Sequence, residues 1–133
     1  MEKETIMDNE YYTLLYYPDK KIIHHTFHKF TQGQNFRDGL DAGAKLLEEK
    51  KVKKWLSDDR KNSVIVKEDM NWGATVWRPR VIKAGWKYWA LVFPEKAIGQ
   101  LNMKQIIKEY ADTGVTAQIF NNPDEALTWL EAQ

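Results

Sequence analysis

The 133-residue sequence predicts a single α/β domain in which helices cover a mixed sheet. A run of aromatic and β-branched residues near the start has the pattern of a β-hairpin. After it, short apolar segments alternate with amphipathic helical patterns, which requires crossover connections and hence parallel strands. The expected order is β-β-α-β-α-β-α-β-α, with about five strands and about four helices in one domain over residues 11–133.

The hairpin is predicted from two segments, Tyr11–Tyr17 and Ile22–Phe30, joined through Pro18 and Asp19. Proline presets a turn, and aspartate stabilises one by bonding to nearby backbone. Residues 1–10 are rich in acidic side chains and are expected to form a flexible tail. Further strands are expected, each bounded by helix or turn signals, at residues 52–56, 86–93 and 115–120.

The helix over residues 34–50 is predicted from an apolar stripe that includes Phe36, Leu40 and Leu47. A second helix is expected over residues 68–84, where Pro79 lacks a backbone donor and predicts a kink or break near Trp77-Arg78. Two more helices are expected at residues 101–113 and after the sequence Asn121-Asn122-Pro123, which is typical of a capped helix start.

The composition excludes several classes of function. Lys and Arg number 20 against 19 Asp and Glu, so the net charge of +1 argues against nucleic-acid or membrane coating. The absence of cysteine excludes disulfides, thiolate metal sites and a cysteine nucleophile. No segment has the length of a membrane span or the pattern of a signal peptide, which predicts a cytoplasmic protein. No phosphate loop, dinucleotide fingerprint or nucleophile elbow is present, so we expect a non-enzymatic protein without a cofactor.

Three histidines lie in one predicted strand, at His24, His25 and His28. Alternation along a strand separates His25 from the other two, which lie about 13 Å apart in strand register. This is too far to share a zinc ion, so no metal site is expected. We expect a solvent-facing hairpin whose imidazoles become charged near neutral pH.

A polar segment with Asp58, Asp59, Arg60 and Asn62 follows the third predicted strand. Ligands of open α/β sheets bind at the carboxyl ends of strands, so these residues are candidates for binding a ligand or a partner. The carboxylates are suited to accept protons or orient an arginine, and the guanidinium to hold a carboxylate or phosphate. The alternative is a solvated turn pinned by Asp–Arg pairs.

Tryptophan is abundant, with six residues in the chain. Trp72, Trp77 and Trp86 surround Arg78 in the sequence and are candidates for a pocket wall. Trp77 shares an apolar helix stripe and is also compatible with core packing, whereas Trp72 falls off the stripe and suits an interface. An apolar pocket with one arginine is suited to amphipathic acids or lipids.

Three segments resemble a known family: WLSDDRKN (55–62), VWRPRVIKAGWKYWALVFPEKAIGQLNMK (76–104) and GVTAQIFNNPDEALTWL (114–130). The chain resembles small bacterial proteins described as STAS-like or SpoIIAA-like, mostly without an assigned activity. The resemblance implies the fold of anti-sigma-factor antagonists, which is related to the CRAL-TRIO lipid-binding domain. Those antagonists are switched by phosphorylation of a serine in an Asp-Ser-small-Gly signature. The signature is absent here, and Ser57 and Ser63 are the nearest candidates.

Two hypotheses about function follow. The first is a regulatory or scaffolding module that binds a protein partner or forms a homodimer. It is favoured by uneven charge, because residues 109–133 contain five acidic residues and no Lys or Arg. The second is a carrier or sensor of a small molecule or lipid, with a pocket formed by Trp72, Trp77 and Trp86 and gated by Asp58, Arg60 and Arg78.

Overall fold

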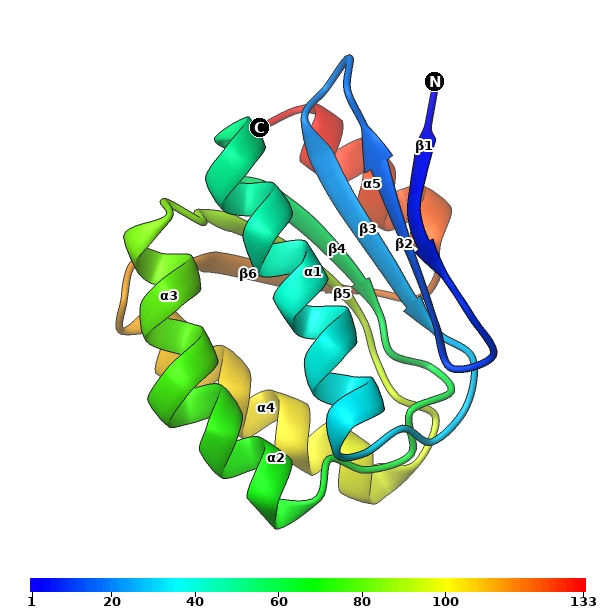
Figure 1. Ribbon diagram of the computed structural model, residues 1–133, viewed down its shortest axis with the longest axis vertical. Coiled ribbons are helices and arrows are strands. Elements are labelled where there is room, and N and C mark those ends of the chain that lie inside the picture. Colours follow the sequence, from blue (N-terminus) through cyan, green and yellow to red (C-terminus); the bar gives the residue numbers. More distant parts are fainter.

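The computed structural model describes all residues, 1–133, as one six-stranded sheet with helices on both faces (Figure 1). The strands lie side by side in chain order, the first two pairings antiparallel and the other three parallel. The α/β mixed-sheet prediction is therefore confirmed, with one strand more than expected. The strands are β1 (Glu4–Asp8), β2 (Tyr12–Tyr17), β3 (Ile22–Phe27), β4 (Lys54–Asp58), β5 (Tyr88–Val92) and β6 (Thr116–Phe120).

Most helices cover one face of this sheet. In Figure 1 α1, the helical segment from α2 to α3, and α4 lie in front of the strands, while α5 lies behind them. The parallel strands β3 to β6 are joined through helices, as the alternating sequence pattern requires. The helices are α1 (Gln34–Lys50), α2 (Lys67–Trp72), the π-helical turn η1 (Gly73–Trp77), α3 (Arg78–Lys83), α4 (Ala97–Ala111) and α5 (Pro123–Glu131).

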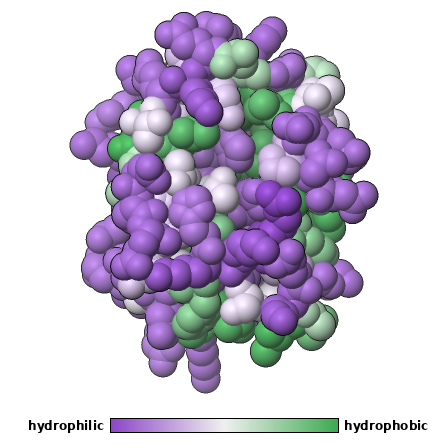
Figure 2. All heavy atoms as spheres, turned by 90° about the vertical axis from the view of Figure 1, so that its right-hand side faces the viewer, coloured by the Kyte–Doolittle hydropathy of each residue, from purple (hydrophilic) through white to green (hydrophobic).

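The extra strand corrects the expectation of a flexible tail over residues 1–10. Residues Glu4–Asp8 form β1, which pairs antiparallel with β2 from Glu4 opposite Tyr16 to Asp8 opposite Thr13. Its side chains are mostly exposed, because an edge strand is held by backbone hydrogen bonds and does not need an apolar face. The side of the molecule that carries β1 is mostly hydrophilic, with hydrophobic atoms visible between charged groups (Figure 2).

Strand β4 lies two residues later than the expected range of 52–56. Its parallel pairing with both neighbours continues to Asp58, which lies opposite Thr26 of β3 and Val92 of β5. Ser57 and Asp58 are therefore buried inside the sheet, and the polar loop begins only at Asp59. The predicted strand ended too early because Ser57 and Asp58 are polar, but a central strand accepts polar side chains that find hydrogen-bond partners.

The helical segment over residues 67–83 is continuous, and Pro79 does not break it. A π-helical turn, Gly73–Trp77, lies directly before the proline, and the N–H of Arg78 donates to the carbonyl of Gly73 five residues back. Pro79 then occupies the first turn of α3, where its missing donor matters little. The irregularity expected near Trp77-Arg78 is thus a widened turn, a feature frequent at functional sites.

Two hydrophobic cores lie on opposite faces of the sheet, as strand alternation requires. The larger core contains Trp55, together with Leu47 of α1 and Val81 of α3. The smaller core contains Leu56 and packs against Leu130 of α5. None of the helices combines the length and the apolar character needed to cross a membrane.

Candidate ligand-binding cavity

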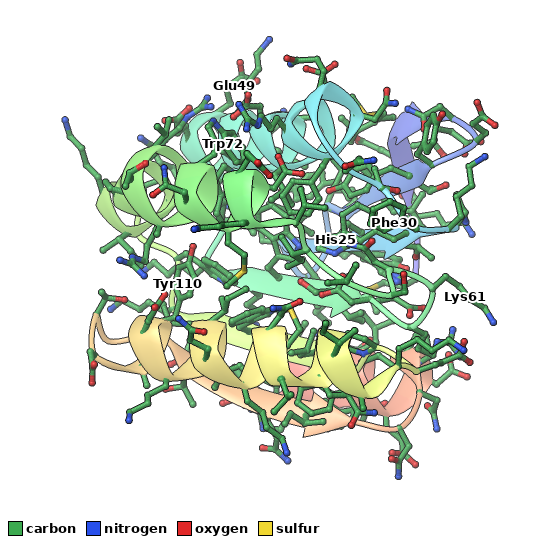
Figure 3. All side chains as sticks on the ribbon, turned by 90° about the horizontal axis from the view of Figure 1, so that it is seen from below. His25, Phe30, Glu49, Lys61, Trp72 and Tyr110 are labelled. Carbon is green, nitrogen blue, oxygen red and sulfur yellow. The ribbon has the colours of Figure 1, made fainter.

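A cavity of about 90 Å³ lies within the larger core, between the sheet and helices α1, α2, η1, α3 and α4. In Figure 3 the molecule is seen from below, with the α2–α3 segment on one side, α4 on the other, and Tyr110 and His25 between them. The lining comprises 23 residues, of which 13 are hydrophobic. A single water molecule needs roughly 10–15 Å³ for its centre, so the space is large enough for a small ligand.

Aromatic rings form a continuous wall of this cavity. Their centroids lie between 5.2 and 6.5 Å apart, in tilted and edge-to-face arrangements that aromatic pairs prefer. Because each ring packs against at least two others, the wall is rigid and already formed. The five rings, hereafter the aromatic wall, are Trp55, Trp77, Trp86, Trp89 and Tyr110.

The indole N–H groups of the aromatic wall are all satisfied within the protein. Trp77 donates to the carbonyl of Leu40 and Trp86 to the carbonyl of Tyr88, at 2.8 and 2.9 Å. Trp89 donates to Ser57 Oγ, and Trp55 donates to His25 Nδ1, each at 2.9 Å. The aromatic wall therefore offers a ligand ring surface and no free indole donor.

The polar end of the cavity is formed by His25 and Asp59. His25 Nε2 lies 2.7 Å from Asp59 Oδ1, and the two side chains are only 4% and 8% exposed. Since Trp55 donates to Nδ1 of the same ring, that nitrogen is an acceptor and the proton resides on Nε2. His25 is therefore a neutral imidazole of fixed tautomer that donates to the carboxylate.

Asp59 is held in place but incompletely paired. Its backbone N–H donates to the carbonyl of Val92 at 3.1 Å, and His25 donates to Oδ1. The other carboxylate oxygen accepts no hydrogen bond, although the residue is 94% buried and lines the cavity. This oxygen is not fully enclosed by protein atoms, so it is accessible to a donor or a cation within the cavity.

The other charged groups at the cavity already have partners. Asp69, almost fully buried, accepts from the backbone N–H of Gly33 at 2.8 Å and from Arg37 Nε at 3.1 Å. Arg78 Nη1 lies 2.7 Å from Glu109 Oε2, which joins α3 to α4. The Arg78 guanidinium also lies over the ring of Tyr110, 5.9 Å from its centroid.

Five of the eight residues predicted as binding candidates line this cavity, as does the phosphorylation candidate Ser57. The loop supplies Asp59 and Asn62, and Asn62 Oδ1 accepts the backbone N–H of Thr31 at 3.1 Å. The loop after β4 and the lining residues Trp77 and Trp86 lie 15 or more residues apart in the sequence, and the fold brings them together at one cavity. The other three are Trp77, Arg78 and Trp86.

Asp58 and Arg60 do not line the cavity. Strand alternation places the Asp58 side chain on the same face as Leu56, opposite to Asp59. Arg60 binds it through two parallel bonds, Nε to Oδ1 at 2.9 Å and Nη2 to Oδ2 at 2.8 Å. This pair matches the alternative interpretation, in which an Asp–Arg pair pins the turn.

Trp72 also lies outside the cavity. Its ring contacts Phe36 edge-to-face, with centroids 6.4 Å apart, and lies 5.5 Å from the guanidinium carbon of Arg37. The side chain is half-buried between α1 and the end of α2. Trp72 therefore attaches these helices to each other and does not form the wall that the sequence suggested.

The two serines differ in position. Ser57 is 3% exposed inside β4, and its Oγ accepts from Trp89, so a phosphoryl group has no space there. Ser63 is half-buried in the loop between β4 and α2, and its carbonyl oxygen lies close to Gly99 of α4. Neither residue lies at the start of a helix.

The expectation of a solvent-facing, readily charged hairpin is wrong for His24 and His25. His25 lies in the cavity wall, and burial lowers the pKa of His24 to about 4. His24 Nδ1 lies 3.0 Å from the Tyr17 hydroxyl, while His28 is exposed and lies 2.6 Å from Thr13 Oγ1. No group of three His, Asp or Glu side chains is close enough together to hold a metal ion.

Most of the 23 lining residues were not among the predicted site residues, and these include His25, Trp55, Trp89 and Tyr110. Alternation along β4 was a usable signal for one of them, because Trp55 lies two residues before Ser57 and four before Asp59. For Tyr110 the helical stripe shared with Met103 and Ile106 predicts only that it faces the core, since its position opposite Trp89 depends on how α4 crosses the sheet.

The arrangement offers a bound molecule an aromatic wall and one carboxylate oxygen of Asp59. Both nitrogens of His25 are engaged, so the ring has no free lone pair with which to deprotonate a substrate. No protein-family model matches the chain, and searches of curated proteins and of solved structures give no match either. The interpretation of the cavity therefore depends on its own geometry.

Proposed function

We propose that the protein is a non-enzymatic module that binds a small molecule in the cavity, as a carrier or sensor. One observation carries this proposal: a preformed cavity, walled by five aromatic rings, ends at a buried carboxylate with an unpaired oxygen. Ligand sites are commonly apolar hollows with a few convergent polar groups, and this cavity has that form.

The position of the cavity supports the same function. It extends to the carboxyl ends of the parallel strands β3, β4 and β5, where Phe27, Asp59 and Pro94 line it. This is the edge at which open α/β sheets bind ligands. The cavity is partly open to the surface, so a small molecule can reach the aromatic wall.

Binding of a protein partner is the second candidate function, and the structure gives it less support. That hypothesis assigned the role of exposed anchor to Trp72 and a contact to Arg60, and both side chains are engaged within the chain. A homodimer and membership of the STAS-like family remain proposals, and the mixed sheet with helices on both faces is compatible with that family's fold.

The test is native mass spectrometry of the protein purified from its own host, compared with the spectrum after denaturation. We expect additional mass that disappears on denaturation. The variant Ala74→Phe places a ring at a lining position and should lower the liganded fraction at least tenfold. Ala111→Phe is the matched control, because Ala111 is exposed at the end of α4 and does not line the cavity.

Two results would contradict the proposal. The first is a native spectrum that shows only the bare protein mass, together with a tryptophan fluorescence that does not change on titration with small aromatic compounds. This combination would mean that the cavity is not a ligand site. Equal liganded fractions in Ala74→Phe and Ala111→Phe would place the bound molecule elsewhere on the protein.

A further inference from the structure

We infer that the cavity selects a small organic cation: an ammonium group on an apolar body no larger than a single ring. This inference rests on the proposed function and specifies the ligand class. It differs from the amphipathic acids or lipids that the sequence suggested, because the charge of the arginine on which that expectation depended is balanced by a neighbouring glutamate. Arg78 is bound to Glu109 at 2.7 Å.

Charge pairing around the cavity identifies the group that lacks a partner. Four lining residues other than histidine carry charge: Asp59, Asp69, Arg78 and Glu109. Arg78 and Glu109 neutralise each other, and Arg37 neutralises Asp69 from outside the cavity. Asp59 alone remains without a cation, since its single hydrogen bond comes from a neutral imidazole.

The Asp59 carboxylate is also positioned to face a ligand. It is held by His25 on one oxygen and by its own backbone bond to β5, which leaves the second oxygen for an occupant. An ammonium group supplies both the positive charge and the N–H donors that this oxygen lacks, whereas a carboxylate ligand would add repulsion at a site of low polarity.

The aromatic wall favours the same class of ligand. Indole and phenol rings attract cations within about 6 Å of the ring centre, and more strongly where water is excluded. Four of the five rings in the wall are indoles, which are the strongest of the aromatic side chains in this respect. Their N–H groups are used internally, so they contribute no donors that would favour an anion.

The experiment uses three ligands of the same size that differ in charge: benzylammonium, benzyl alcohol and benzoate. Isothermal titration calorimetry of each against the wild-type protein at pH 7 measures the affinity. We expect benzylammonium to bind about tenfold to a hundredfold more tightly than benzyl alcohol, the range of a charge-assisted hydrogen bond. Benzoate should bind most weakly.

Asp59→Asn, which preserves the size of the side chain, should remove this preference by lowering benzylammonium affinity about tenfold or more while leaving benzyl alcohol affinity nearly unchanged. Asp58→Asn is the matched control, because it is the same substitution one residue earlier on the opposite face of β4. If Asp59→Asn fails to fold, the order of the three affinities in the wild-type protein still decides.

The outcomes separate the two proposals. Binding of benzyl alcohol or benzoate as tight as that of benzylammonium would overturn the cation inference and leave the small-molecule function standing. A benzylammonium affinity that is equal in Asp59→Asn and Asp58→Asn would overturn it as well. Failure of all three ligands to bind, together with the absence of ligand mass in the native spectrum, would overturn both.

Discussion

His24 and His25 are neighbours in β3, yet the sheet gives them different environments. His25 has a hydrogen-bond partner on each ring nitrogen, Trp55 on one and Asp59 on the other. His24 lies on the opposite face, where Tyr17 reaches Nδ1 and Nε2 is buried without a partner. A protonated His24 would place a charge in this apolar surrounding, which is why burial lowers its pKa from the usual 6.5 to about 4.

This shift predicts a loss of stability in acid. The unfolded chain binds a proton at His24 near pH 6.5, and the folded chain only near pH 4, so protons favour the unfolded state between these values. The full contribution is present above pH 6.5 and is lost as the pH falls to 4, by on the order of 2–3 kcal/mol. Urea denaturation of wild type and His24→Gln across this range measures it, with the variant showing the weaker pH dependence.

His28→Gln is the control for the His24 measurement, because His28 is exposed and contacts Thr13 at the surface. Its pH dependence should match that of the wild type. Identical slopes of unfolding free energy against pH in wild type and His24→Gln would show that the buried imidazole does not govern acid stability.

At the scale of single elements, the contact between α1 and β4 fixes the aromatic wall. Gly43 of α1 faces the ring of Trp55, and a Cβ built there would overlap the ring atoms. The missing side chain lets the helix approach the sheet closely and confines the indole from above. Trp55 in turn contacts Trp77 and Trp86, with both ring centroids 5.5 Å from its own.

We expect Gly43→Ala to lower the free energy of unfolding by about 1–3 kcal/mol, since overpacking outweighs the better helix propensity of alanine. Gly73→Ala is the matched control in another helical segment, where no atom lies within 4 Å of an added Cβ. That variant should be neutral or more stable by up to about 1 kcal/mol. Thermal and urea unfolding of both variants test this, and a Gly43→Ala protein as stable as Gly73→Ala would show that α1 can move away from Trp55.

At the scale of the whole molecule, α4 is the most weakly attached of the long helices. Only three of its 15 residues are buried, Gly99, Met103 and Tyr110, whereas seven of the 17 residues of α1 are buried. Ile98 and Leu101 of α4 point to the exterior. The Arg78–Glu109 ion pair connects α4 to α3 beside the cavity and is one of the few polar contacts that hold α4.

Arg78→Met should therefore accelerate amide hydrogen exchange in α4 by about two- to fivefold, the range for a partly exposed ion pair worth up to about 1 kcal/mol. Arg80→Met is the matched control, because Arg80 binds Glu48 and Asp41 of α1 and makes no ion pair with α4. Hydrogen exchange resolved by mass spectrometry measures both variants. Equal exchange of α4 in the two would show that the ion pair does not hold the helix.

Local sequence patterns were enough to predict the class of the fold and most of its elements. The helix over residues 34–50 matches α1, because a period of 3.6 residues and a small-residue stripe are local properties. The helix cap at Asn122 could also be predicted from the sequence, since its side chain accepts the N–H of Glu125 within one turn. The loop after β4 was recognised as a candidate site because it follows a buried strand, and Asp59 and Asn62 indeed line the cavity.

Which polar residues are paired and which face the cavity depends on contacts between distant segments of the chain. Asp58 and Asp59 are chemically alike and adjacent, yet one is neutralised by Arg60 and the other faces the aromatic wall, because strand alternation sends them to opposite faces. The edge strand β1 was not predicted, because it is held by backbone pairing to β2 and its sequence therefore needs no apolar pattern. Tyr110 and Trp89 come into contact only because α4 lies across β5, and a contact between such distant segments cannot be predicted from local periodicity.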